Sequence, residues 1–169
     1  VYHWSDILLD GPQKKIQMEN LKQTLQNMGR AGISTMGYYF SLAGVWGRSY
    51  GPFARGGANA DAFYGDTITH ADPIPEGEVW GMVYKQSDEK RFIEPVSNDI
   101  MWERLSYFLN ELVPIAEASA VRLAAHPDDP PAKSLRSSAR LLTHPDHFQK
   151  LLDIYPSYSN ALEFCQGTV

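Results

Sequence analysis

Residues 98–131 read NDIMWERLSYFLNELVPIAEASAVRLAAHPDDPP, a stretch that predicts a long helix, a strand and a rigid loop in succession. The helix covers 98–118, because apolar side chains recur there at spacings of three and four and therefore share one face. They are Met101, Leu105, Phe108, Leu109, Leu112 and Ile115. Ser97 or Asn98 can cap the first turn by accepting a hydrogen bond from a free backbone N–H. Pro114 lies inside the pattern and is expected to kink or break the helix.

Val121 to Ala125 predicts a strand, and residues 126–131, His-Pro-Asp-Asp-Pro-Pro, end it because they can continue neither a helix nor a strand. The same criteria, applied outward, predict helices at 13–28 and 145–154 and strands at 33–40 and 160–165. Strands joined through helices run parallel. We therefore expect an α/β fold, either a partial (β/α)8 TIM barrel or an open doubly wound sheet. No Gly-x-Gly-x-x-Gly follows a predicted strand, which weakens the dinucleotide-binding version of the second architecture.

Residues 41–96 interrupt this alternation with many glycines and prolines and with one strand-like stretch, 79–84. Connections of this length are uncommon unless they form a lid or a binding loop. We therefore expect a lid-like insertion over the carboxyl ends of the strands, within a single domain that covers 1–169. A full barrel takes about 250 residues, so the barrel interpretation requires further strands before and after this sequence.

Composition excludes several classes of partner. The chain has 169 residues, with 15 Lys or Arg and 20 Asp or Glu, which gives a formal charge of −5. No basic cluster provides the electrostatic footprint of a nucleic-acid partner. No apolar run approaches the roughly 20 residues that span a bilayer, and the first residues lack the pattern of a secretory signal. The single cysteine, Cys165, excludes a disulfide within the chain and suits a reducing compartment, so we expect a cytoplasmic protein.

Two potential metal ligands follow consecutive predicted strands. His126 comes directly after Ala125, and Cys165 ends the strand at 160–165. Sites in parallel α/β folds form at the carboxyl ends of the strands. Imidazole and thiolate both bind borderline divalent metals such as Zn²⁺, Fe²⁺ or Mn²⁺. We therefore expect both side chains to point into one cavity and share a metal ion, although a lone strand-end cysteine is more often a small buried hydrophobe.

Three charged residues allow two interpretations each. Asp128 and Asp129 lie in a loop restricted by prolines, where they either present fixed carboxylates to a ligand or only stiffen and cap the turn. Arg48 follows Trp46 and Gly47 in the long connection. Its guanidinium either binds a substrate carboxylate in bidentate fashion or lies on the surface, stacked on the ring of Trp46.

The run VRLAAHPDDPP, from Val121 to Pro131, resembles the V-R-M-A-x-H-P-D-D-P-P segment of mannonate dehydratases. The preceding helix, with its internal proline, resembles the corresponding helix of that family, and Cys165 stands where the family has a cysteine ligand. The similarity extends over nearly the whole chain and is weak between residues 50 and 96. The family is similar in fold to xylose isomerase-like barrels, which is the fold that the resemblance implies here.

The resemblance also implies a divalent metal, most often Mn²⁺ or Fe²⁺, held by a His, a Cys, a second His and an Asp. His126 and Cys165 match the first two ligands, and the other two would lie beyond the end of this sequence. Where the family typically reads Y-N-F-M-P-x-x-D-W-T-R, this chain reads YYFSLAGVWGR over residues 38–48. Trp46 and Arg48 match, whereas Tyr39, Val45 and Gly47 replace an Asn, an Asp and a Thr.

The implied reaction removes water from D-mannonate or a related sugar acid and gives a 2-keto-3-deoxy acid. Trp46 and Arg48 would bind the substrate, with Arg48 orienting its carboxylate, and Asp128 and Asp129 would support other site residues or contact hydroxyls. A metal at the carboxylate would stabilise the enediolate as it forms. The alternatives are a sugar isomerase or epimerase on the same scaffold and an inactive, truncated binding or assembly module. As partners we expect the sugar acid and further copies of the chain in a homo-oligomer.

Overall fold

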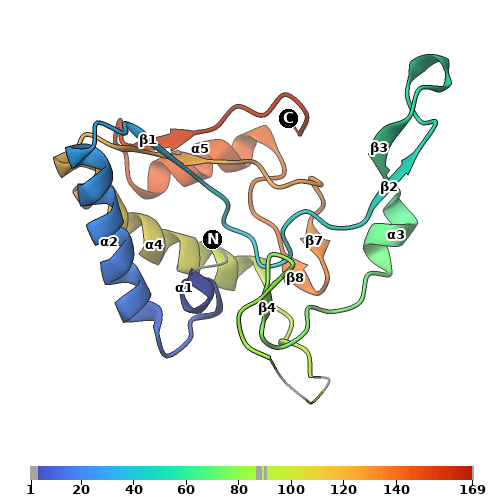
Figure 1. The fold of residues 1–169 in the computed structure, drawn as a ribbon, viewed down its shortest axis with the longest axis horizontal. Coiled ribbons are helices and arrows are strands. Elements are labelled where there is room, and N and C mark those ends of the chain that lie inside the picture. Colours follow the sequence, from blue (N-terminus) through green and yellow to red (C-terminus); the bar gives the residue numbers. More distant parts are fainter. Residues whose placement is uncertain (1–3, 87–88, 90, 169) are drawn as a thin grey trace.

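The computed structural model describes residues 4–86, 89 and 91–168 (Figure 1). Its helices are α1 (Ser5–Leu9), α2 (Lys14–Arg30), α3 (Gly65–Thr69), α4 (Asn98–Ala118), α5 (Pro145–Ile154) and the 3₁₀ turn η2 (Arg55–Gly57). Its strands are β1 (Thr35–Tyr38), β2 (Arg48–Gly51), β3 (Ala60–Phe63), β4 (Glu78–Val79), β5 (Met82–Val83), β6 (Arg122–Ala125), β7 (Ser134–Leu135), β8 (Ser138–Ala139) and β9 (Asn160–Leu162). The helices predicted at 98–118 and 145–154 are confirmed with both their ends.

The three predicted strands form one parallel sheet in the order β1-β6-β9. Gly37 pairs with Ala124, and Ala124 pairs with Ala161 on the other side. The predicted α/β fold with neighbouring parallel strands is therefore confirmed. The strands are shorter than predicted, because the ladder ends where Glu163 N–H donates to Ala125 O at 2.9 Å, and the next residue, Phe164, is 80% exposed.

The helices pack against one face of this sheet. Met36 and Tyr38 of β1 are buried on that face, and Phe108 of α4 lies 5.1 Å from the Tyr38 ring. The opposite face carries Thr35 and Gly37, which are exposed. A doubly wound sheet has helices on both faces, whereas an arc of a (β/α)8 barrel has them on one. That the sheet is such an arc stays a prediction, which this one-sided packing favours.

Helix α4 is not broken at Pro114, which was one of the two effects expected of that proline. Ser97 caps the helix as predicted, with its Oγ accepting from Ile100 N–H at 3.3 Å, and the helix continues past Pro114 to Ala118. Proline removes one hydrogen bond to the carbonyl four residues earlier, here that of Asn110. Both Pro114 and Asn110 face solvent, so water can satisfy that carbonyl while the opposite side of the helix packs into the core.

Residues 41–96 contain more regular structure than predicted. The strand-like stretch at 79–84 is a tight hairpin of β4 and β5, with Trp80 and Gly81 at positive φ between them. Strands β2 and β3 form a second hairpin, which projects away from the parallel sheet together with α3 (Figure 1). Other parts of the segment lie at the sheet's carboxyl edge, where Trp80 packs edge-on against Tyr39, the residue after β1. Its role as a lid stays a prediction.

A third hairpin, β7 and β8, follows the proline-rich loop, which is the His-Pro-Asp-Asp-Pro-Pro segment at 126–131. Its turn residues Arg136 and Ser137 both have positive φ. The hairpin is joined to the long segment by Arg136, whose guanidinium donates to Glu78 at 2.8 Å and to the carbonyl of Asp72 at 3.1 Å. Within the described residues, no helix is both long and apolar enough to cross a membrane.

Candidate functional site

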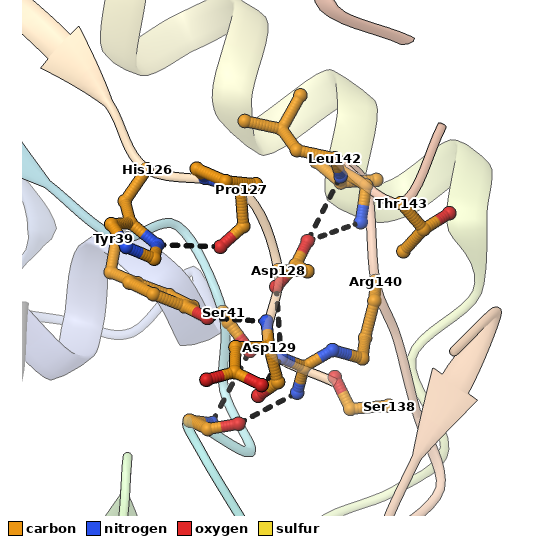
Figure 2. Close-up of polar contacts among 12 residues, drawn as sticks. Tyr39, Ser41, His126, Pro127, Asp128, Asp129, Ser138, Arg140, Leu142 and Thr143 are labelled. Carbon is orange, nitrogen blue, oxygen red and sulfur yellow. Dashed lines mark hydrogen bonds and ion pairs between the residues drawn. The ribbon is translucent and has the colours of Figure 1, made fainter. Parts of the chain in front are cut away.

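His126 occupies the carboxyl end of the central strand, as predicted. Its backbone N–H donates to Tyr38 O at 2.9 Å, which extends the β1–β6 ladder by one bond. Its ring Nδ1 lies 2.6 Å from the carbonyl oxygen of Pro127 (Figure 2). A carbonyl only accepts hydrogen bonds, so Nδ1 carries a proton, and the tautomer compatible with this contact has its lone pair on Nε2. Metal-binding histidines are commonly held in this way, with one ring N–H donated to a carbonyl.

Tyr39 is the closest aromatic partner of His126. The two rings stack with centroids 4.9 Å apart and planes inclined by 23° (Figure 2). The Tyr39 hydroxyl accepts from Asp129 N–H at 2.5 Å. Burial, followed by the nearby Asp128 carboxylate, raises the pKa of the Tyr39 hydroxyl above its usual range, so this group is neutral at physiological pH. In the sequence, Tyr39 stands out only as a departure from the family pattern.

Asp128, within the proline-rich loop, forms a buried ion pair with Arg140 (Figure 2). Asp128 is 3% exposed, and its Oδ2 accepts from the N–H groups of Leu141 and Leu142 at 2.8 and 2.9 Å. Its Oδ1 lies 3.3 Å from Arg140 Nη2. Burial raises the pKa of Asp128, while the Arg140 charge and the two amides act in the opposite direction. These contacts are those of a residue that holds the loop in place, one of the two roles considered for Asp128.

Arg140 joins three segments that are distant in sequence. Its side chain is fully buried, and its guanidinium donates to Gly44 O at 2.7 Å and to Asp129 O at 2.8 Å. Gly44 belongs to the connection after β1, and Asp129 belongs to the proline-rich loop after β6. Sequence reasoning missed Arg140, because an arginine beside Leu141 and Leu142 carries no signal of its burial.

Arg48, the first residue of β2, contacts the proline-rich loop at Asp129. Its Nη2 is 2.5 Å from Asp129 Oδ2, with the side chains 44% and 13% exposed. The alternative that Arg48 stacks on Trp46 is wrong, since Arg136 takes that place, 5.5 Å from the Trp46 ring, and Arg48 lies over Phe63. The structure thus joins Arg48 to Asp129, while Trp46 lies against Arg136 of the β7–β8 hairpin. At the other end of the guanidinium, Nη1 lies 3.9 Å from Asp61 Oδ2. This is beyond hydrogen-bond distance, so the exposed guanidinium has further N–H donors for an anionic ligand.

Cys165 follows β9, the strand beside β6. It is half-buried, and its carbonyl accepts from Thr168 N–H at 3.1 Å in a turn. Because β6 and β9 are parallel neighbours, His126 and Cys165 lie beyond the same edge of the sheet. That they share one metal ion stays a prediction. Among the described residues, no group of three or more His, Cys, Asp or Glu side chains is arranged to hold a metal, so a complete metal shell needs ligands from elsewhere.

The face of the sheet away from the helices carries one further carboxylate, which sequence reasoning did not single out. A methyl group placed on Gly37 would lie 3.0 Å from Oε2 of Glu163. The Glu163 side chain therefore extends from the β9 end toward β1, across the strand that ends at His126. Glycine at position 37 leaves the space for it.

Comparisons with known proteins identify a family for this chain. A sequence profile described as D-mannonate dehydratase (UxuA) matches residues 1–169. Mannonate dehydratase 2 of Halalkalibacterium halodurans is 30% identical over 172 residues, which cover 97% of this chain and 49% of that protein. The mannonate dehydratase of Endomicrobium trichonymphae is 32% identical over 181 residues, with 97% and 49% covered.

The similarity extends to three dimensions. The crystal structure of mannonate dehydratase from Streptococcus suis serotype 2 matches with a TM-score of 0.73 and 28% sequence identity, over 93% of this chain and 43% of that chain. The chain spans about half the length of the curated relatives it matches. The residues matched by the family profile, 1–169, include the parallel sheet, the proline-rich loop and both candidate metal ligands.

Proposed function

The chain belongs to the D-mannonate dehydratase family, and we propose on this basis that its protein removes water from D-mannonate or a related aldonate to give a 2-keto-3-deoxy acid. The observation that carries the proposal is the state of His126 at the carboxyl end of β6. Its Nδ1 is occupied by the Pro127 carbonyl, which leaves the Nε2 lone pair for a metal. The exposed guanidinium of Arg48, at the same loop, provides the cationic group that a sugar acid requires.

The donor set fits a divalent cation, with Mn²⁺ or Fe²⁺ as the proposed ion and His126 and Cys165 as two of its ligands. Bound there, the cation would supply electrostatic stabilisation of the negative charge that develops when C2 loses its proton. Arg48 binds and orients the substrate carboxylate, and Asp129 holds the guanidinium at its other end. Asp128 and Arg140 keep the loop backbone in place beneath these groups. The remaining ligands come from outside these residues.

The proposal is tested by incubating the natural full-length protein with a panel of aldonates, with added Mn²⁺ or Fe²⁺ or after treatment with a chelator. We expect loss of D-mannonate, or of one related aldonate, matched mole for mole by a 2-keto-3-deoxy acid detected as its semicarbazone. Chelation is expected to stop turnover and metal to restore it. Turnover that survives complete metal removal would contradict the metal assignment, and an absence of 2-keto-3-deoxy acid from every aldonate would contradict dehydration.

The Arg48→Lys variant is expected to raise KM by about tenfold or more, because lysine replaces a planar fork of donors with a single point charge. The unfolding free energy is expected to change by less than about 1 kcal/mol, since exposed ion pairs contribute little to stability. Steady-state kinetics and urea unfolding measure the two effects. Arg55→Lys, at an exposed position in η2, is the matched control. An unchanged KM in the Arg48 variant would remove Arg48 from the substrate site.

A further inference from the structure

We propose that Tyr39 is a positioning residue, which fixes the orientation of the His126 ring and couples it to the Asp129–Arg48 pair. This inference rests on the proposed function, because it assigns His126 a metal to bind. Tyr39 lies between the two parts of the site. Its ring stacks on the imidazole at 4.9 Å, and its hydroxyl accepts from Asp129 N–H at 2.5 Å.

The imidazole is held on two sides. The bond from Nδ1 to the Pro127 carbonyl fixes one edge of the ring, and the stacked Tyr39 ring restricts rotation about the bond that joins imidazole to Cβ. Terminal torsions of this kind are broad in the absence of packing. With both contacts in place, the imidazole ring has one orientation, and the Nε2 lone pair points in one direction. Without the Tyr39 ring, the imidazole would sample others, and a metal ligand that must first be ordered binds more weakly.

A second aromatic ring also packs against Tyr39. Trp80 packs edge-on against its ring with centroids 5.8 Å apart. The Trp80 backbone is held by its N–H bond to Leu42 O at 2.7 Å, and its ring covers Gly44, where an added methyl group would approach within 2.8 Å. The order Trp80, Tyr39, His126 is therefore a continuous row of packed rings that runs from the β4–β5 hairpin to the end of β6.

The Tyr39 hydroxyl connects the His126 ring to the Asp129–Arg48 pair. The backbone N–H of Asp129 donates a hydrogen bond to the Tyr39 hydroxyl. Its carboxylate accepts one from Arg48, and its backbone carbonyl accepts one from Arg140. Removal of the hydroxyl alone leaves the stacked ring in place and frees only the Asp129 backbone. The two functions of Tyr39 can therefore be separated, with Tyr39→Phe removing the hydroxyl and Tyr39→Met removing the ring while retaining apolar volume.

The test uses the natural full-length protein with Co²⁺ as the metal probe, followed through the absorption of its bond to the Cys165 thiolate and by calorimetry. Tyr39→Met is expected to raise the cobalt dissociation constant about 10- to 100-fold, the range found when partners that orient metal-bound histidines are removed. Tyr39→Phe is expected to bind cobalt within about threefold of the wild type and to raise KM for the sugar acid more than it changes kcat. Nitrogen-15 spectra of the metal-free protein are expected to show one His126 tautomer in wild type and a mixture in Tyr39→Met.

Equal cobalt affinity and one unchanged tautomer in wild type and Tyr39→Met would overturn the inference, even if the variant melted at a lower temperature. Should Tyr39→Met fail to fold, Trp80→Leu makes the same test by removing the ring that packs edge-on against Tyr39. It is expected to weaken cobalt binding at least threefold, and no change would overturn the inference. A wild type that binds cobalt but dehydrates no aldonate contradicts the proposed reaction and leaves the Tyr39 comparison valid. A wild type that binds no cobalt overturns the metal assignment and, with it, the Tyr39 inference.

Discussion

The His126→Gln variant is expected to lose its metal and at least about 100-fold of kcat/KM. Removing a group that only orients a metal-bound histidine lowers metal affinity or activity by about 10- to 100-fold. Removing the ligand itself is therefore expected to lower activity by at least about 100-fold. Glutamine retains a polar side chain of similar length but offers a weakly donating amide oxygen in place of the imidazole Nε2. Metal content by mass spectrometry and steady-state kinetics measure the two effects. Cys165→Ser is expected to reduce both quantities in the same direction.

A control separates this loss from unfolding. His70 is an exposed histidine at the end of α3, so His70→Gln removes the same group away from the sheet. Both single variants are expected to show the near-ultraviolet dichroism of the wild type. If the His126 variant retained a full equivalent of metal, the ligand assignment would be wrong, whatever happened to its rate. If only Cys165→Ser retained metal, the shared site would be wrong and His126 would remain.

The parts of the fold that were predictable from sequence are those determined by local pattern. The bounds of α4 and α5 follow from apolar spacing, from the Ser97 cap and from proline at the first position of α5. The parallel order of the sheet follows from alternation of strands and helices. The β7–β8 hairpin was missed because its turn places Arg136 and Ser137 at positive φ, where turn signals normally rely on glycine or asparagine.

Site residues could be predicted from the sequence only where they directly follow a predicted strand, because the carboxyl ends of parallel strands form the site. His126 was identified because it directly follows β6. The choice between the two roles of Asp128 needed its burial and its bonds to the amides of Leu141 and Leu142, which come from a segment thirteen and fourteen residues away. Tyr39 acquires its role from contacts with His126 and Trp80, on different segments. Such contacts have no signature in a single sequence, because nothing local distinguishes a stacked tyrosine from a surface one.

The Arg140→Met variant is expected to lower the unfolding free energy by about 3–5 kcal/mol, because removing one partner of a buried pair leaves the other charge uncompensated. Arg140 is fully buried against Asp128, and it also donates to Gly44 O and Asp129 O, whose carbonyls would lose these donors. Urea unfolding at neutral pH measures the effect. Arg55→Met removes an exposed arginine and is expected to change stability by no more than about 0.5 kcal/mol. A loss of under about 1 kcal/mol for Arg140→Met would show that the pair does not hold the loop.

The pH dependence of that loss identifies its cause. Burial already raises the pKa of Asp128, and removing the Arg140 charge, which opposes this shift, raises it further. An acid whose folded pKa lies above its unfolded value destabilises the folded state at high pH, and the penalty is relieved as pH falls through the folded pKa. The stability gap between wild type and Arg140→Met is therefore expected to narrow from pH 8 toward pH 5. In an Asp128→Asn background, where position 128 cannot ionise, adding Arg140→Met is expected to produce a gap that stays constant over this range. A gap that narrows equally in both backgrounds would mean that another group titrates and that the Asp128 carboxylate is not the uncompensated charge.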